Sequence, residues 1–411
     1  MVKLKLSDKL REFVKQDSVF KDKKSMQASY IPDEIEHRDE QINQIAEILS
    51  PALKSEKPSN VFIYGKTGTG KTLSVKYTAD EILSVSKEAG ASVKVIYINC
   101  KLKKVADTEY RLIAEIAREF GKVIPPTGLP TDEVYKIFFK ALEDAHVVLM
   151  LILDEIDQLV KKVGDGILYN LTRINSELSN SQISIIGISN DLMFANHLDP
   201  RVKSSLTEEE LIFPPYNAIQ IQDILKKRSD LAFKENVVDA GVIPKCSAYV
   251  ARDYGDARRA IDLLRVAGEL AERSKSPKVT LDHLDEAENK IEKDRVVDVV
   301  KTQPKQHQAT LFSIFSLLQD ESHKKKGVFT GDVYSVYKDL CSKVGLRPIT
   351  QRRLSDIVGE LDMLGLINAK VISKGRHGRT REIHMGVPTH LIDKIYSMLS
   401  KELDITIADL D

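Results

Sequence analysis

Eight residues toward the N-terminal end of the chain have the types and spacing of a loop that binds phosphate. They follow the G-x-x-x-x-G-K-[ST] pattern and are Gly65, Lys66, Thr67, Gly68, Thr69, Gly70, Lys71 and Thr72. The glycines let the backbone curl so that successive N–H groups face phosphate oxygens. Lys71 would neutralise the β- and γ-phosphates, and the Thr72 hydroxyl would ligate Mg²⁺. A plain Gly-rich turn is the alternative, but an apolar run before the loop and a helical pattern after it favour a nucleoside triphosphate site.

Two acids directly after a strongly apolar run are the next candidates for chemistry. Residues 147–153 predict a buried strand that leads into Asp154 and Glu155. Ligands of open α/β sheets bind at the carboxyl ends of the strands, so we expect both acids there, on the strand next to that of the phosphate loop. Asp154 would complete the Mg²⁺ site, and Glu155 would orient or polarise the attacking water. Without such a loop nearby, acids after a strand would be ordinary solvated residues.

Three more polar residues could complete a site for nucleotide hydrolysis. Asn190 follows a predicted strand at residues 183–188, where its amide could hold the attacking water near the γ-phosphate. Arg201 and Arg258 lie outside the predicted sheet and could sense the charge of the terminal phosphate. The ordinary alternatives are a turn or cap residue for Asn190 and solvent-exposed side chains for the arginines.

The order of elements along the chain explains how these residues would be brought together. Short apolar runs alternate with amphipathic stretches over residues 61–213, which predicts a parallel α/β sheet. Its expected strands are 61–64, 93–98, 147–153 and 183–188. After Pro214 and Pro215 the spacing is helical to about residue 293, with a helix start at Gly255-Asp256, and a polar linker is expected over 301–308. The predicted divisions are 1–20 for a polar segment, 21–213 for the α/β domain, 214–296 for a helical domain, 297–395 for a third domain and 396–411 for a tail.

The third predicted domain has a helix-turn-helix pattern. Residues 332–344 carry apolar residues at helical spacing, and Thr350 is the expected N-cap of a second helix that Gly365 ends. Arg352 and Arg353 would be exposed at the start of this second helix, where recognition helices contact bases. The alternation after it predicts a β-hairpin wing with a basic turn, whose charged residues are Lys374, Arg376, Arg379 and Arg381.

Charge is distributed unevenly along the chain. Sixty-one Lys and Arg balance sixty-one Asp and Glu overall, yet residues 301–385 hold fifteen Lys or Arg against eight Asp or Glu. Local positive charge of this kind suits contact with the phosphate backbone of double-stranded DNA. The alternative is a winged helix that binds protein, with charges that only aid solubility.

Composition excludes several classes of protein. The 411 residues, of which 42% are hydrophobic, suffice for two or three folded domains. The cysteines Cys100, Cys246 and Cys341 include no C-x-x-C pair, which excludes a disulfide framework and a zinc ribbon. The longest strongly apolar run, residues 147–153, is far shorter than the roughly 20 residues of a membrane span, and the charged start lacks the core of a signal peptide. We therefore expect a cytoplasmic, nucleoid-associated protein that contacts no membrane.

Together these motifs resemble the archaeal replication initiators of the origin-recognition and cell-division-control (Orc/Cdc) type, over nearly the whole chain. The motifs that carry the resemblance are the loop 65–72, the acids 154–157, the helix 166–173, Ser189-Asn190, the run 198–204, Phe213-Pro-Pro-Tyr216, Gly255-Asp-Ala-Arg258 and the basic wing. The fold that the resemblance implies is an AAA+ P-loop parallel sheet with a helical lid, followed by a winged-helix domain.

The resemblance also implies roles around the nucleotide. Arg258 resembles the second sensor of the lid, and Tyr216 and Arg228 resemble residues that line the nucleotide site. His37-Arg38 resembles the element that precedes the adenine pocket.

Two further regions gain a role through the resemblance. Residues 108–134 resemble a helical insertion by which such initiators touch DNA, with Thr127 and Leu129 as the contacts, although an ordinary helix pair with a Pro-rich loop is the alternative. Related eukaryotic subunits have a second arginine where this chain has Ser205, which leaves Arg201 as the arginine-finger candidate.

The function implied is ATP-dependent initiation of DNA replication. Such a protein binds origin duplex DNA, helps to recruit or load the replicative MCM-type helicase, and hydrolyses ATP slowly, so that its ATP or ADP state with Mg²⁺ acts as a switch. Its partners would be double-stranded DNA, the helicase and paralogous initiators. Two alternatives stay open: an AAA+ winged-helix motor such as a branch-migration helicase, and a transcription regulator that uses the winged helix alone.

Overall fold

The structure is a computed structural model that divides into two compact units, Met1–Leu284 and Asp285–Asp411. It describes residues 11, 17–27, 30–32, 34–101, 106–206, 208–253, 255–319, 327–373, 379–387 and 389–405.

A parallel sheet of five strands is the centre of the N-terminal unit. Its strands are β1 (Asn60–Tyr64), β2 (Val93–Asn99), β3 (Val148–Asp154), β4 (Gln182–Ser189) and β5 (Glu208–Ile212), in the order β2-β3-β4-β1-β5. The four expected strands are present, and β5 is an additional edge strand that the sequence patterns did not predict. One expectation was wrong: β3 is not next to β1, because β4 lies between them and pairs with both.

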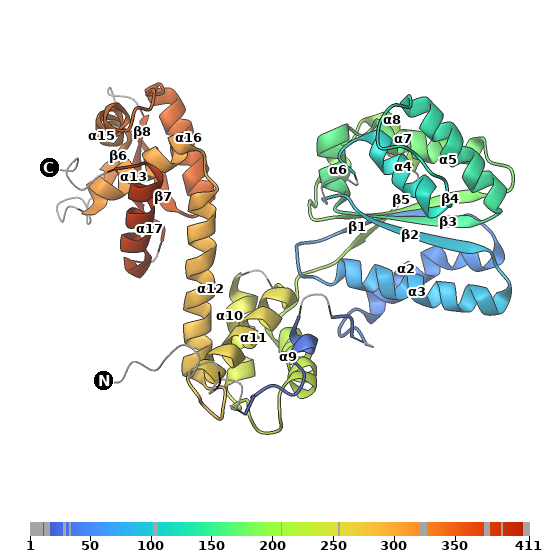
Figure 1. Ribbon diagram of the computed structural model, residues 1–411, viewed down its shortest axis with the longest axis horizontal. Helices are drawn as coiled ribbons and strands as arrows, with labels where there is room; N and C mark the ends of the chain where they lie inside the picture. The colour runs from blue at the N-terminus through green and yellow to red at the C-terminus, as the bar shows by residue number, and fades with distance from the viewer. Residues whose placement is uncertain are drawn as a thin grey trace. The chain divides into compact units, whose positions relative to one another are not determined.

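Helices cover both faces of this sheet (Figure 1). One face carries α2 (Asp39–Leu49) and α3 (Lys71–Ala89), whose apolar side chains pack on β1, β3 and β4. The other face carries α4 (Glu109–Glu119), α5 (Thr131–Ala145), α6 (Ile156–Val163), α7 (Gly166–Arg173) and α8 (Pro200–Leu206). The connecting segments include the short 3-10 helices η2 (Ser50–Lys54), η3 (Ile174–Ser176) and η4 (Phe194–His197).

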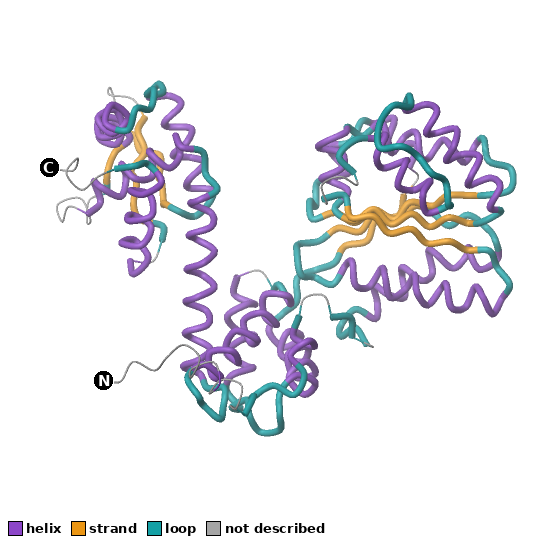
Figure 2. Tube along the Cα trace, in the orientation of Figure 1, coloured by secondary structure: helices purple, strands orange, loops and turns teal. Residues whose placement is uncertain are grey.

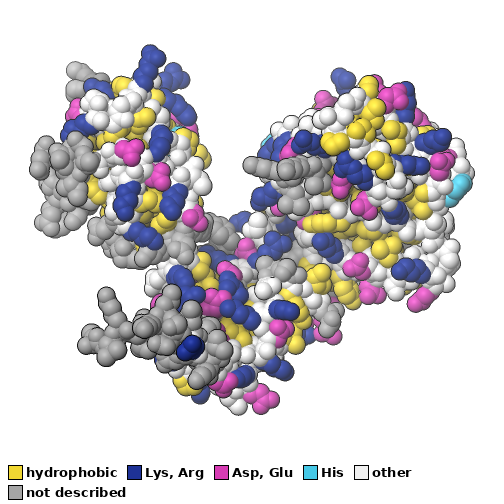
Figure 3. Space-filling model, viewed as in Figure 1, with side chains coloured by type: hydrophobic (Ala, Val, Ile, Leu, Met, Phe, Trp, Pro, Cys, Tyr) yellow, Lys and Arg dark blue, Asp and Glu magenta, His cyan; other side chains and the backbone are white. Residues whose placement is uncertain are grey.

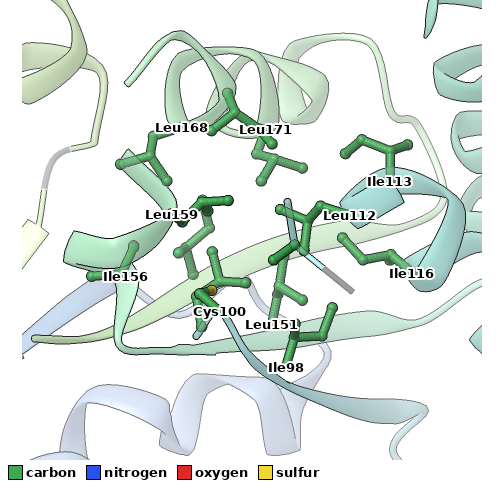
Figure 4. Packing of buried hydrophobic residues seen from close by; sticks show 14 of the residues in the cluster. Ile98, Cys100, Leu112, Ile113, Ile116, Leu151, Ile156, Leu159, Leu168 and Leu171 are labelled. Carbon is green, nitrogen blue, oxygen red and sulfur yellow. The ribbon is translucent and has the colours of Figure 1, made fainter. Parts of the chain in front are cut away.

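The larger core of this unit lies between the sheet and the second helical layer. Figure 4 shows Ile98 of β2 and Leu151 of β3 below Leu112 of α4 and Leu159 of α6, with Leu168 of α7 above Leu159. Each of these side chains is almost fully buried, which contributes roughly 1.5–3 kcal/mol apiece to folding. The apolar layer therefore fixes the sheet whose carboxyl edge carries the candidate acids.

Three helices follow the sheet as a lid within the same unit (Figure 2). They are α9 (Ala218–Ala232), α10 (Val242–Asp253) and α11 (Ala257–Arg273). A capping box formed by Asn217 and Gln220 starts α9, and Asp256 starts α11 by accepting hydrogen bonds from the backbone N–H groups of Arg258 and Arg259. The helix start expected at Gly255-Asp256 is thereby confirmed. The N-terminal η1 (Lys23–Met26) packs on α9 and α11.

The C-terminal unit is a helical bundle with a small antiparallel sheet. It contains most of α12 (Leu281–Lys301), then α13 (Lys305–Gln319), β6 (Val328–Phe329), α15 (Thr330–Lys343), α16 (Gln351–Met363), β7 (Ile367–Ser373), β8 (Arg379–Met385) and α17 (Thr389–Glu402), with strand order β6-β8-β7. Thr350 caps α16 by accepting from the Arg353 N–H, as expected. The linker expected over 301–308 was wrong, because α12 continues to Lys301 and α13 begins at Lys305.

Charged side chains of both signs lie on the surface. Figure 3 shows Lys and Arg side chains interspersed with Asp and Glu on the face in view. Among the described residues, no helix is both long and apolar enough to cross a bilayer. The same part of the chain contains no cluster of three or more His, Cys, Asp or Glu residues with the arrangement of a metal site.

Candidate functional site

The phosphate loop joins β1 to α3 and brings Lys71 back over the start of the loop. Lys71 is the first residue of α3 and is only 5% exposed. Its Nζ donates to the carbonyl oxygens of Gly65 (2.7 Å) and Lys66 (2.8 Å) and to Oδ1 of Asn190 (2.9 Å). Burial lowers the pKa of Lys71 to about 8, against an opposing effect of the Asp154 carboxylate. A buried cation therefore lies at the end of β4, beside Asn190.

Thr72 and Asp154 form a pair of oxygen donors next to this cation. Thr72 Oγ1 donates to Asp154 Oδ2 at 2.9 Å, and Asp154 ends β3 with little exposure. Mg²⁺ prefers hard oxygen ligands and is commonly bound by one or two protein oxygens together with substrate phosphates. A hydroxyl and a carboxylate this close, beside a loop with phosphate-binding geometry, therefore fit Mg²⁺.

Tyr97 is a neighbour of this pair that the motifs did not predict. Its hydroxyl donates to Asp154 Oδ2 at 2.7 Å, and Nζ of Lys76 lies 3.6 Å from the centroid of its ring. Burial and the hydrogen bond to Asp154 raise the pKa of Tyr97, so the phenol keeps its proton. The available signal was a hydroxyl-bearing aromatic near the carboxyl end of β2, where Asn99 pairs in register with Asp154.

Glu155 turns the chain from β3 into α6. Its φ of 55° is left-handed, an uncommon conformation for a residue with a side chain, which directs the chain sharply at the edge of the sheet. Glu155 Oε2 lies 3.5 Å from Nζ of Lys101, and the lysine is largely exposed. The candidate catalytic carboxylate thus has a solvent-screened partner from the segment that follows β2.

The lid touches the phosphate loop through the start of α11. Asp256 Oδ2 accepts from Thr67 Oγ1 at 3.3 Å, and Ala257 N donates to the carbonyl oxygen of Gly68 at 3.2 Å. Gly68 has φ of +69°, and a Cβ there would lie 1.7 Å from Asp256 Oδ1, so only glycine fits this approach. Arg258 is the second residue of α11 and lines the cleft. Thr69 stays within the loop, since its hydroxyl donates to the carbonyl oxygen of Lys66 at 2.8 Å.

Arg38 joins the loop to the segment that leads into the lid. It is 2% exposed, its Nε donates to the Thr69 carbonyl oxygen at 2.9 Å, and its guanidinium donates to the Pro214 carbonyl oxygen at 2.6 Å. The guanidinium lies 3.9 Å from the centroid of the Tyr216 ring. Gly70 has φ of +89°, and a Cβ there would lie 2.8 Å from the Tyr216 hydroxyl. The position of Tyr216 is therefore set from both the loop and Arg38.

A cleft of about 600 Å³ opens between the loop, the lid and the N-terminal segment. Predicted nucleotide residues in its lining are Gly68, Gly70, Thr72, Tyr216, Arg228 and Arg258, and apolar ones include Ile31, Pro32, Ile224 and Ile261. A wall that is mostly apolar with a few convergent polar groups is typical of a ligand site. Arg228 lines the cleft while it donates to the carbonyl oxygens of Ser25 (3.0 Å) and Tyr30 (3.3 Å).

The N-terminal segment is tied to the lid by charged side chains. Lys227 of α9 pairs with Glu34 at 2.8 Å and with Glu36. His37 Nε2 lies 3.1 Å from Asp223 Oδ2. One wall of the cleft therefore belongs to residues 27, 30–32 and 34–36, and α9 contacts this segment through Lys227.

Three predicted residues of the N-terminal unit belong neither to the lining of this cleft nor to the contacts of the phosphate loop described above. Arg201 is exposed in the first turn of α8, which packs against α7. Thr127 is exposed in the loop between α4 and α5. Leu129 of the same loop is half-buried against the core between the helices and the sheet, which restricts its availability to a partner.

Two of the predicted DNA contacts of the C-terminal unit lie on α16, and a third lies beside it. Arg352 is exposed in its first turn, whereas Nη1 of Arg353 is 3.0 Å from Oε1 of Glu360. The guanidinium of Arg381, on β8, lies over α16 at Gly359, where an added Cβ would be 3.2 Å from it. Lys374 and Arg376 lie outside the described residues, as does the side chain of Arg379.

Three family models match consecutive parts of the chain. They are an AAA domain over residues 54–192, a Cdc6 AAA+ ATPase-type lid domain over 222–289, and a CDC6 C-terminal winged-helix domain over 298–395. These matches agree with the expected α/β sheet, lid and winged helix.

Known proteins resemble the chain over almost its full length. ORC1-type DNA replication protein 1 of Methanosarcina mazei is 52% identical over 92% of this chain and 90% of its own, and the ORC1-type DNA replication protein of Pyrococcus horikoshii is 50% identical over 96% and 93%. The structure of the Aeropyrum pernix ORC1 protein in complex with DNA aligns with a TM-score of 0.79 at 42% identity, covering 94% of this chain and 98% of that one. On these matches, and as its motifs predicted, the chain belongs to the family of ORC1-type DNA replication proteins.

Proposed function

We propose that this replication initiator binds ATP with Mg²⁺, binds origin duplex DNA, and helps to recruit or load the replicative helicase. The observation that carries the nucleotide part is that two hydrogen-bonded pairs lie at one edge of the sheet: Lys71 with Asn190, and Thr72 with Asp154. These residues come from β1–α3, β4 and β3, and a buried lysine with a lowered pKa is typical of a functional site.

The residues divide the work of binding and hydrolysis. Backbone N–H groups of the loop and Lys71 would bind the β- and γ-phosphates, while Thr72 and Asp154 would hold Mg²⁺. Glu155 would orient the attacking water, Asn190 would hold it near the γ-phosphate, and Arg258 would reach that phosphate from the lid. Mg²⁺ supplies charge neutralisation of the phosphates when it is bound.

The DNA part of the proposal rests on the C-terminal unit and on a relative. The Aeropyrum pernix ORC1 protein, to which the chain is 42% identical, was solved in complex with DNA. Residues 301–385 carry the surplus of positive charge, and Arg352 is exposed on α16, where base contacts are made by recognition helices. Thr127 in the exposed α4–α5 loop would add a contact from the N-terminal unit.

Turnover distinguishes the proposed switch from a motor. A switch should hydrolyse ATP slowly, retain ADP, and respond weakly to duplex DNA. A branch-migration motor should show many turnovers and strong stimulation by DNA, and a transcription regulator should bind DNA independently of nucleotide. We would measure phosphate release with and without duplex DNA, and DNA binding to origin and scrambled duplexes in ATP and ADP. Strong DNA-stimulated turnover would overturn the switch.

Recruitment is tested with the helicase itself. The proposal expects the purified helicase to be retained on origin duplex only when the initiator is present. Retention should depend on whether the initiator holds ATP or ADP. Equal retention on scrambled duplex would contradict a role in loading at origins.

A further inference from the structure

Asp154 is held by more donors than the phosphate-loop motif accounts for. Its Oδ2 accepts from both Thr72 Oγ1 (2.9 Å) and the Tyr97 hydroxyl (2.7 Å), and its Oδ1 accepts from the Glu155 N–H at 3.0 Å. The three donors come from α3, β2 and the turn after β3. A carboxylate held on both oxygens cannot rotate about its Cβ–Cγ bond without losing a hydrogen bond.

The orientation of the Asp154 carboxylate also sets the orientation of the Thr72 hydroxyl. The hydroxyl of Thr72 has one proton and two lone pairs, and its proton is directed to Asp154. The lone pairs are then free to face a cation in the cleft that Thr72 lines. Rotation of the Asp154 carboxylate would turn the hydroxyl and misdirect those lone pairs.

We propose that Tyr97 is a positioning residue for the divalent metal: its hydroxyl fixes the Asp154 carboxylate, and through it the Thr72 hydroxyl, in the orientation that binds metal with ATP. This inference rests on the proposed Mg²⁺–ATP site. Removing a group that hydrogen-bonds to a metal ligand and orients it typically lowers metal affinity by about 10- to 100-fold.

The Tyr97 ring is itself fixed in place. Nζ of Lys76 lies 3.6 Å from the ring centroid, and Lys76 follows Thr72 by one turn of α3. In the β2–β3 register, Tyr97 pairs with Ile152, two residues before Asp154. The hydroxyl therefore approaches the carboxylate from a rigid strand rather than from a loop.

The test separates metal binding from nucleotide binding. We would titrate the full chain and its Tyr97→Phe variant with ATP by calorimetry, once with Mg²⁺ and once with EDTA. The ratio of the two affinities measures the coupling between metal and ATP, and it requires no turnover. We expect Tyr97→Phe to bind ATP in EDTA within about twofold of the wild type but to lose about tenfold of the Mg²⁺ enhancement.

Two variants serve as controls for this result. Tyr135→Phe removes another phenol that donates to a carboxylate in the same unit, Glu109 at 2.6 Å, and should leave the Mg²⁺ enhancement unchanged. In an Asp154→Asn background, Tyr97→Phe should cause no further loss, because Tyr97 acts through Asp154. Thermal unfolding of each variant checks that it is folded.

Each outcome decides the inference. A normal Mg²⁺ enhancement in Tyr97→Phe would overturn it, and so would equal weakening of ATP binding in EDTA, which would mean that Tyr97 only supports the loop. If Tyr97→Phe lowered the Mg²⁺ enhancement as much in the Asp154→Asn background as in the wild type, Tyr97 would not act through Asp154. This comparison of the double variant with the two single variants remains informative if one single variant is less stable. A wild type that binds no ATP in either condition would instead contradict the proposed nucleotide function.

Discussion

The Nζ atom of Lys71 lies 2.9 Å from Oδ1 of Asn190, although 119 residues separate them in the sequence. The contact exists because β4 pairs with β1 on one side and β3 on the other, so its last residues reach the edge between the phosphate loop and the acids. An amide at this point contacts the cation that would bind the γ-phosphate. Strand order, rather than the loop motif, thus joins the two halves of the site.

Replacing Lys71 tests the nucleotide assignment. Lys71→Ala should weaken ATP binding at least thirtyfold or so, because charge-assisted hydrogen bonds contribute roughly 2 kcal/mol each. Calorimetric titration measures the effect. Lys87→Ala, an exposed lysine in the last turn of the same helix, should bind ATP normally. Unchanged affinity in Lys71→Ala would place the site elsewhere.

Glu155 is expected to act in hydrolysis and not in binding. Glu155→Gln should keep ATP affinity within about threefold and reduce turnover at least about a hundredfold, since Thr72 and Asp154 remain while the carboxylate that activates water is lost. Phosphate release in single-turnover conditions is the measurement. Glu177→Gln, at an exposed acid of the same unit, should hydrolyse ATP as the wild type does. Wild-type turnover in Glu155→Gln would show that another group activates the water.

The lowered pKa of Lys71 predicts that ATP binding takes up a proton. Burial sets this pKa at about 8, so the ammonium is progressively lost as pH rises above 8, whereas bound phosphate charge would raise the pKa again. ATP affinity should therefore fall as pH rises from 8 to 10, by at most about tenfold per pH unit. Calorimetry at pH 8.5 or so in two buffers of different ionisation enthalpy should detect the proton. Lys71→Arg keeps its charge throughout, so identical buffer dependence in that variant would refute this explanation.

The phosphate loop and the acids at the carboxyl edge of the sheet could be predicted because their sequence patterns are local. A run such as residues 147–153 is apolar without interruption since β3 is buried on both faces, and the acids directly follow it. The caps at Asp256 and Thr350 were predictable for the same reason, because a cap depends on residues within one turn.

Other features depend on contacts between distant segments. β5 has the sequence Glu-Glu-Glu-Leu-Ile, whose acids are tolerated because it is an edge strand, so it lacks an apolar signal. Tyr97 gains its partner only when β2 pairs with β3, and Arg38 gains its partners only when the lid segment returns to the loop. The continuation of α12 past residue 293 was missed because residues 296–300 contain four valines, whose branched side chains favour strand over helix. The domain boundaries and the roles of the site residues stay predictions.

The contact between lid and loop predicts a stability effect at Asp256. Asp256→Ala removes the N-cap of α11 and the hydrogen bond from Thr67, and should destabilise the unit by about 1 kcal/mol, with a larger loss of ATP affinity because Arg258 follows on that helix. Thermal unfolding and ATP titration measure the two effects. Asp256→Asn keeps a cap acceptor and should retain most of the stability. If Asp256→Asn lost as much stability as Asp256→Ala, capping would not be the cause of the loss.

We expect the replacement of two arginines on adjoining elements of the C-terminal unit to weaken DNA binding in different ways. Arg352 is exposed at the start of α16, so Arg352→Ala should cost about 1–3 kcal/mol on the origin duplex and little on a scrambled one. Arg381 lies over Gly359 from the wing strand, so Arg381→Ala should weaken both duplexes and lower the slope of log affinity against log salt by roughly 0.9. Arg353 is held by Glu360, so its replacement should have a smaller effect than that of Arg352.

Binding isotherms on origin and scrambled duplexes at several salt concentrations measure these effects for each variant. Lys394→Ala, on the exposed side of α17, controls for the loss of one positive charge and should change neither specificity nor affinity by more than about twofold. The wing residues Arg376 and Arg379 are predicted to contact backbone phosphates with Arg381. Because each phosphate contact releases counterions independently of base sequence, loss of all three should reduce the salt slope by roughly 3 on both duplexes. Full-strength binding after that triple replacement would mean that the winged helix is an interaction module, and that DNA contact must come from the loop that carries Thr127.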